Sequence, residues 1–181
     1  MKELLHHEDE LHLDLRTLTF RFTQPRGKEP RSKETLRNFR ERGSGTVLGK
    51  VDPDKEREIQ YWVNVAENGI TDDAVRISVQ KFRVALNELN DRLQQDPYLL
   101  GGDLTVLDVA WDVYVNRLVR CGYPLEQLHP NVNRWFWSLR NRPEFDREMK
   151  VSPQIQEAVE ENHRLQKEMG ATLVDVAGLK I

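Results

Sequence analysis

The stretch Tyr98–Trp111 reads YLLGGDLTVLDVAW and contains a complete start signal for a buried helix. Gly101 and Gly102 permit a tight turn, because glycine adopts backbone conformations that other residues avoid. Thr105 then takes the N-cap position, with Asp108 three residues later, which is the spacing of a capping box that uses aspartate for the usual glutamate. The pattern predicts a structural role for Thr105 and Asp108, which satisfy free backbone donors at the start of the helix.

Apolar residues recur at helical spacing on both sides of this start. After it, four large side chains follow at steps of four, three and four residues: Leu107, Trp111, Tyr114 and Leu118. Before it, six follow at alternating steps of four and three: Val75, Val79, Phe82, Leu86, Leu89 and Leu93. Such steps place side chains on one face of a helix. The sequence therefore predicts two long helices joined by the glycine turn.

Other segments also favour helices. Residues 53–68, 130–141 and 153–169 have helical patterns, and a proline stands near the start of each. Residues 2–22 fit either a helix or a strand, and we favour a helix because no second strand is predicted to pair with it. Residues 23–52 are rich in proline and glycine, so we expect loops around a short helix at 32–41.

Taken in order, these features resemble the all-helical C-terminal domain of the glutathione transferase superfamily. The motif that follows also matches, since residues 129–145 read HPNVNRWFWSLRNRPEF, a proline-opened helix with a tryptophan at Trp135 and a closing Arg-Pro. The resemblance implies an all-α fold, a glutathione transferase C-terminal-like helical bundle. We expect it to span residues 1–150, with a loop region at 23–52, and a C-terminal helix and tail at 151–181 to pack on it.

The resemblance also implies how function is divided. In the family, a thioredoxin-like domain that precedes these helices binds and activates glutathione, and no residue here matches the family's thiol-activating residue. We therefore expect no catalytic residue and no cofactor in this chain, with glutathione supplied only by a missing or partner thioredoxin-like domain. The helices would form the hydrophobic wall for the co-substrate, with Arg16, Phe20 and Tyr114 as candidate binding residues. The alternative is a non-catalytic interaction module, because similar helical domains serve as assembly scaffolds.

Composition and charge bear on the partners. The net charge of −3 gives no overall attraction to nucleic acid or to anionic lipid. No apolar run approaches the ~20 residues that span a bilayer, and the acidic first ten residues do not suit a targeting peptide, so we expect a cytoplasmic protein.

Leu5, Leu13 and Phe20 lie off the main apolar face of the first helix, which favours a homodimer. The expected partners are a second copy or a thioredoxin-like domain, and a small hydrophobic ligand.

Three further features invite a functional interpretation. His6, His7 and His12 do not have the i, i+4 spacing of a zinc-binding helix, so we expect no metal site. Residues 26–42 contain seven basic and three acidic side chains and could hold a phosphate or an acidic partner, although such segments are usually only solvated. The lone cysteine, Cys121, has no histidine near it in the sequence, and we expect it to be buried and inert.

Overall fold

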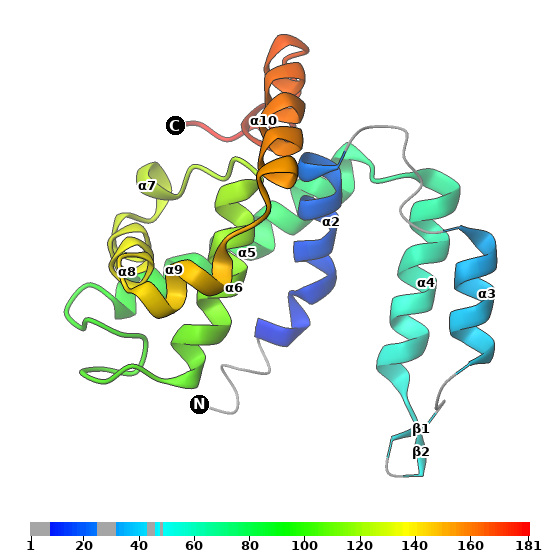
Figure 1. The fold of residues 1–181 in the computed structure, drawn as a ribbon, viewed down its shortest axis with the longest axis horizontal. Coiled ribbons are helices and arrows are strands. Elements are labelled where there is room, and N and C mark those ends of the chain that lie inside the picture. The colour runs from blue at the N-terminus through cyan, green and yellow to red at the C-terminus, as the bar shows by residue number, and fades with distance from the viewer. Residues whose placement is uncertain (1–7, 25–31, 43–45, 48) are drawn as a thin grey trace. The chain divides into compact units, whose positions relative to one another are not determined.

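The computed structural model of the chain describes residues 8–24, 32–42, 46–47 and 49–181. Its secondary structure is almost entirely helical (Figure 1). The chain forms two compact units, of which the first comprises Met1–Pro25 and Asp72–Ile181 and the second comprises Arg26–Thr71. The all-α fold predicted from the sequence is confirmed.

The helices of the first unit agree with the predicted ones where the periodicity is long. They are α2 (His12–Thr23), α5 (Asp72–Arg92), α6 (Val106–Arg120), α7 (Leu125–Leu128), α8 (Pro130–Arg140), α9 (Pro143–Met149), α10 (Pro153–Glu168) and α11 (Leu173–Ala177). The described part of the ambiguous segment 2–22 is helical, as predicted. Helices α7, α9 and α11 were not expected, because each has seven residues or fewer, too short for a clear periodic pattern.

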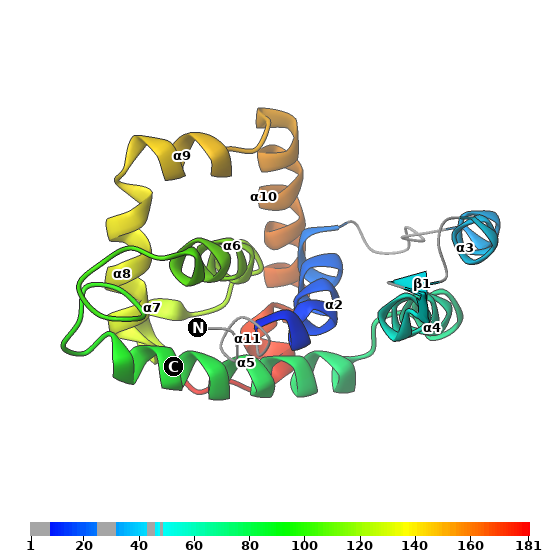
Figure 2. The same cartoon turned by 90° about the horizontal axis from the view of Figure 1, so that it is seen from below.

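Helix α6 lies at the centre of the first unit. Figure 2 views this helix end-on, with α5, α8, α9 and α10 arranged around it. Leu107, Val115 and Leu118 are fully buried, and Trp111 is 1% exposed. Burial of these side chains gives the unit its hydrophobic centre, each contributing roughly 1.5–3 kcal/mol of transfer free energy.

Asp108 fixes the start of α6 through four hydrogen bonds. Its Oδ2 accepts from the backbone N–H of Thr105 at 2.9 Å and from the Thr105 hydroxyl at 2.8 Å. Its Oδ1 accepts from the backbone N–H of Leu99 at 2.9 Å and from the indole N–H of Trp135 at 3.1 Å. One fully buried carboxylate therefore joins the glycine turn, the helix start and α8.

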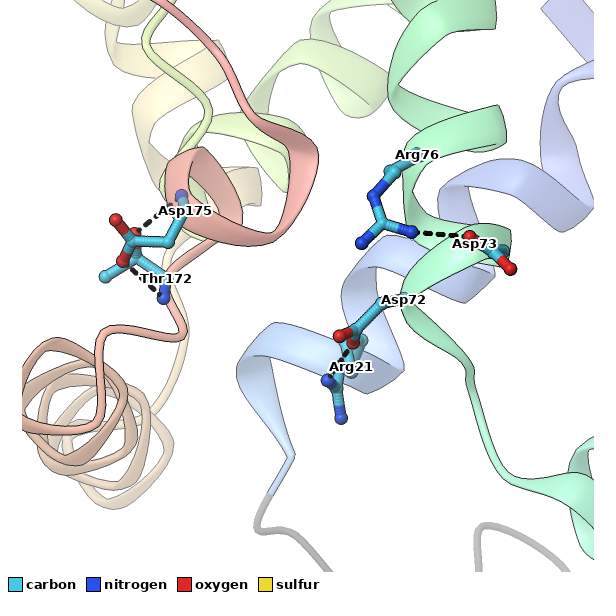
Figure 3. Close-up of polar contacts among 6 residues, drawn as sticks. All are labelled: Arg21, Asp72, Asp73, Arg76, Thr172 and Asp175. Atoms are coloured by element: carbon cyan, nitrogen blue, oxygen red, sulfur yellow. Dashed lines mark hydrogen bonds and ion pairs between the residues drawn. The ribbon is translucent and has the colours of Figure 1, made fainter.

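Polar contacts join α2 to α5 near both ends of α2. The buried carboxylate of Asp14 accepts from the Ser78 hydroxyl at 2.9 Å and from Lys81 Nζ at 2.8 Å. Near the other end, Arg21 Nη2 lies 2.6 Å from Asp72 Oδ1 (Figure 3). Because Asp72 begins α5, this pair joins the two chain segments on either side of the second unit.

Helix α10 caps the end of α2. The Phe22 carbonyl accepts from the side-chain amides of Asn162 at 2.7 Å and Gln166 at 3.0 Å, and the Gln24 carbonyl accepts from Asn162 at 3.2 Å. The last carbonyls of a helix have no partner within the helix, so these amides satisfy groups that the chain itself leaves free. Both amide side chains are buried.

Helix α11 packs along α5. It begins with a second capping box, in which Asp175 Oδ2 accepts from the Thr172 backbone N–H at 3.0 Å and from its hydroxyl at 2.6 Å (Figure 3). Leu173 anchors the helix with a side chain that is 1% exposed. The C-terminal segment is thus attached to the first unit, and the expected division at residue 150 stays a prediction.

The second unit consists of two helices with a short β-hairpin between them in the sequence. Its elements are α3 (Lys33–Glu41), β1 (Thr46–Val47), β2 (Lys50–Val51) and α4 (Pro53–Asn68), and the two strands are antiparallel. Leu36 of α3 and three residues of α4 are buried: Ile59, Trp62 and Val65. The two helices match the predicted segments 32–41 and 53–68, whereas strands of two residues are too short to be recognised in the sequence.

Among the described residues, no helix is both long enough and apolar enough to cross a membrane.

Candidate functional site

The candidate site lies where α2 meets α6, because the three residues proposed from the sequence to bind a co-substrate, Arg16, Phe20 and Tyr114, belong to these helices. The two helices pack against each other and run in the same direction (Figure 1). His12 Nδ1 lies 3.3 Å from the Tyr114 hydroxyl, and Thr19 hydrogen-bonds Cys121. In both pairs the residues are 102 positions apart, so the helices stay in register along this length.

This register aligns polar side chains along the two helices. Arg16 stands level with position 118 of α6, between Arg117 and Arg120. His12, Arg16 and Thr19 follow at steps of four and three on α2, and Tyr114 and Arg117 are three apart on α6, so each set shares one helix face. We refer to the residues His12, Arg16, Tyr114, Arg117 and Arg120 as the polar seam.

The structure places the predicted binding residues on the two helices that form this seam. Arg16 and Phe20 are four residues apart on one face of α2, and both side chains are half-buried. Tyr114 is 6% exposed and belongs to the facing helix. The packing of α2 on α6 is observed, whereas the role of the three residues in binding stays a prediction.

Tyr114 combines an apolar ring environment with a polar contact at its hydroxyl. Its ring centroid lies 5.9 Å from that of Trp111 and 6.4 Å from that of Phe82. Burial raises the pKa of the Tyr114 hydroxyl, and the charge and hydrogen bond of Glu8 raise it further. Burial also raises the pKa of Glu8. The tyrosine is therefore a neutral hydroxyl that can donate or accept a hydrogen bond in the seam.

Arg117 and Arg120 are residues of the seam that the sequence analysis missed. Both side chains are half-buried, and burial lowers the pKa of Arg117, with Arg16 and Arg120 lowering it further. Arg117 follows Tyr114 by three residues and Arg120 follows Arg117 by three, so each neighbours the next on α6, but only the packing of α2 on α6 shows that a third arginine stands beside them.

Asp112 is another polar residue of α6 and does not belong to the polar seam. Asp112 is fully buried, and neither of its carboxylate oxygens has a partner within the described part of the chain. Burial raises its pKa to about 6, although the charge of Arg140 acts in the opposite direction. The helical pattern gave no sign of it, because aspartate interrupts an otherwise apolar helix without any motif.

The other sequence candidates lie apart from the seam or outside the described residues. Cys121 is 1% exposed, and burial raises the pKa of its thiol to about 12, which disfavours the thiolate. In the basic segment 26–42, the arginines that the structure describes are exposed, and Arg40 lies 3.5 Å from Glu56. His6 and His7 are outside the described residues, as is Leu5.

Comparison with known proteins agrees with this architecture. A family model described as the C-terminal domain of glutathione S-transferase matches residues 69–136. Searches of curated proteins and of solved structures give no significant match. The matched segment includes α5, α6 and the glycine turn with its capping box, together with Tyr114, Arg117 and Arg120, whereas α2 precedes it. Residues 69–136 are therefore similar to the C-terminal domain of glutathione S-transferase.

Proposed function

We propose that the first unit is the helical half of a glutathione transferase-type protein and that the seam between α2 and α6 is the wall on which a hydrophobic co-substrate rests. The observation that carries this proposal is that α2, with Arg16 and Phe20 on one face, packs against α6, which carries Tyr114. Ligand pockets combine apolar lining with a few placed polar groups. Aromatic Phe20 and Tyr114 beside a guanidinium fit that description.

In this proposal the chain does not activate glutathione. A transferase must hold the thiol as a thiolate by means of a positioned hydrogen-bond donor. We assign that task to a thioredoxin-like domain, contributed by another part of the same protein or by a partner. The Tyr114 hydroxyl, kept neutral by burial, would orient the co-substrate instead.

The test has a binding arm and a catalytic arm. The chain should bind a hydrophobic aryl ligand, and Phe20→Ala and Tyr114→Phe should each weaken this binding, whereas Phe39→Ala in the second unit should not. Phe39 is 40% exposed on α3 and serves as the matched control. With glutathione and a chromogenic aryl halide, the chain should give only the uncatalysed rate. Turnover that one substitution in this chain abolishes would show that the active site is placed wrongly.

The alternative function is a non-catalytic interaction module, and one observation favours it. Three valines at positions i, i+3 and i+7 of α6 are exposed, with Val106 at 56%, Val109 at 45% and Val113 at 39%. They lie on one side of the helix and leave an apolar strip on the surface. Val109→Lys should abolish complex formation if this strip binds a protein partner, and should leave ligand binding at the seam unchanged.

A homodimer through the first helix stays part of the proposal. Leu13 and Phe20 are half-buried in the first unit, so their remaining surface could be covered by a second copy. Light scattering at high micromolar concentration should report a dimer, and Leu13→Glu should convert it to a monomer. A monomer for the unmodified chain would count against this arrangement.

A further inference from the structure

We propose that the ligand of the seam carries an anionic group, such as a carboxylate, sulfonate or phosphate, and that Arg117 and Arg120 bind this group beside Arg16. This inference rests on the proposed function, because it specifies the chemistry of the co-substrate that the α2–α6 wall would hold.

The first argument is position. Arg117 and Arg120 are three residues apart and therefore neighbours on α6. The register fixed by the His12–Tyr114 and Thr19–Cys121 contacts sets Arg16 of α2 between them. Arg16 and Arg120 both lie close enough to Arg117 for their positive charges to lower its pKa, so three guanidinium groups stand near one end of the seam. Guanidinium groups are planar and match the geometry of carboxylate, sulfonate and phosphate oxygens.

The second argument is the missing counter-charge. Within the part of the chain that the structure describes, Arg117 and Arg120 form no ion pair with a carboxylate, and the Nε of Arg120 is buried without a hydrogen-bond partner. The acidic residue Glu8 hydrogen-bonds Tyr114, three residues before Arg117 on α6. Buried polar groups are normally satisfied, so an unpaired donor between like charges indicates a partner that is supplied from outside.

A structural role at the helix end does not account for this arrangement. Basic residues in the last turn stabilise the helix dipole, and Arg117 and Arg120 occupy the last turn of α6. That effect also operates at solvated positions, where it carries no desolvation cost. Here Arg117 is half-buried beside two like charges, and burial and these charges lower its pKa. Such a cost to stability is typical of residues that bind ligands.

His163 of α10 lies at the same end of the seam. It hydrogen-bonds the backbone of Arg120, and its Nε2 is buried without a partner. A bound anion near Arg120 would therefore find a further nitrogen close to it. Apolar contacts for the rest of the ligand would come from Phe20 and Tyr114.

The test uses two fluorescent probes that differ only by an anionic sulfonate group, anilinonaphthalene sulfonate and its neutral parent phenylnaphthylamine, titrated into the full chain. The sulfonate should bind at least about tenfold more tightly, which corresponds to roughly 1.4 kcal/mol. Arg117→Gln and Arg120→Gln should each reduce this preference several-fold. Arg147→Gln removes the same charge from α9, at a side chain that is 80% exposed, and should have no effect.

Two further measurements separate binding from folding. Arg117→Gln should not lower the melting temperature, because it removes a buried charge, and Arg117→Lys should retain most of the preference for the sulfonate. Equal affinity of the unmodified chain for both probes would be compatible with the proposed hydrophobic binding surface and would overturn the anion site. A preference for the sulfonate that survives in both glutamine variants would overturn it too. Failure of both probes to bind would overturn the proposed function together with this inference.

Discussion

Arg21 and Asp72 are 51 positions apart in the sequence, yet their side chains form an ion pair of 2.6 Å between the last turn of α2 and the first residue of α5 (Figure 3). The second unit, Arg26–Thr71, lies between these residues in the sequence. The ion pair therefore holds together the two points of the first unit between which the second unit is inserted in the sequence. Within α5, Asp73 pairs with Arg76, so both aspartates of the first turn are engaged.

This relationship predicts that the second unit can be removed. Replacing residues 26–70 by a Gly/Ser linker of about ten residues, with an r.m.s. span of roughly 17 Å, should leave a folded protein with one cooperative thermal transition. The helical circular dichroism should fall only by the contribution of α3 and α4. Binding of the aryl probe at the seam should persist.

The Arg21–Asp72 ion pair itself should contribute little to the stability of the shortened chain. The Asp72 side chain is 51% exposed, and exposed pairs contribute about 0–1 kcal/mol. Arg21→Ala in the shortened chain should therefore shift the melting temperature only slightly. An aggregated or molten shortened chain would show that the first unit depends on residues 26–70 for its folding.

The two capping boxes of this chain should differ in their contribution to stability. Thr105→Ala and Asp175→Ala should each cost about 0.5–2 kcal/mol, the usual effect of a lost cap. Asp108→Ala should cost about 3 kcal/mol or more, because it also leaves the buried N–H groups of Leu99 and Trp135 without an acceptor. Urea unfolding of the three variants measures the difference. Equal losses for Asp108→Ala and Asp175→Ala would show that the two buried hydrogen bonds contribute nothing.

The helical part of this fold could be predicted because its signals are local. The stripe on α5 and the start of α6 each lie within about 20 residues, where periodicity and capping chemistry act directly. The turn Gly101 has a φ of 118°, which explains why glycine stands there. The apolar residues of α6 that pack against neighbouring helices could be assigned to one helix face for the same reason.

The seam and its arginines could be predicted only in part, since they depend on which helices meet. Nothing in the sequence shows that α2 runs parallel to α6, and the alignment of Arg16 with Arg117 follows from that packing alone. The same holds for Asn162, whose contact with Phe22 spans 140 positions. The buried Asp112 is not part of any motif, so only its surroundings reveal it.

Asp112 should make stability fall as the pH rises. Its pKa in the folded protein is raised to about 6 from 3.8, so the folded state binds more protons than the unfolded state between these values. The contribution of the protonated Asp112 carboxyl to the free energy of unfolding is therefore fully present below about pH 4 and lost by about pH 6. Its maximum is roughly 3 kcal/mol. Asp112→Asn removes the charge with little change in shape and should raise the unfolding free energy at pH 7.

The matched control for this prediction is Asp175→Asn. Hydrogen bonds from Thr172 lower the pKa of Asp175, so its contribution has the opposite sign and disappears as the pH falls through the lowered value. Urea unfolding between pH 4 and pH 8 distinguishes the two. A pH profile of Asp112→Asn that parallels the unmodified chain would mean that the carboxylate is paired or hydrated in solution.

The cap that α10 supplies to α2 gives the last prediction. Asn162 donates its amide N–H to the carbonyls of Phe22 and Gln24, so Asn162→Asp replaces a donor by a charged acceptor of the same shape, facing carbonyl oxygens. The aspartate variant should be less stable at pH 7 than Asn162→Ala, and it should recover as the pH is lowered and the carboxylic acid regains a donor. Hydrogen exchange should be faster for the amides at the end of α2 in both variants, because the cap is lost.

Asn133→Asp is the control, since Asn133 on α8 uses its oxygen to accept from the Trp137 indole at 3.1 Å, and aspartate keeps that acceptor. If Asn162→Asp proved as stable at pH 7 as the unmodified chain, the amide bonds would not be what holds α10 against the end of α2.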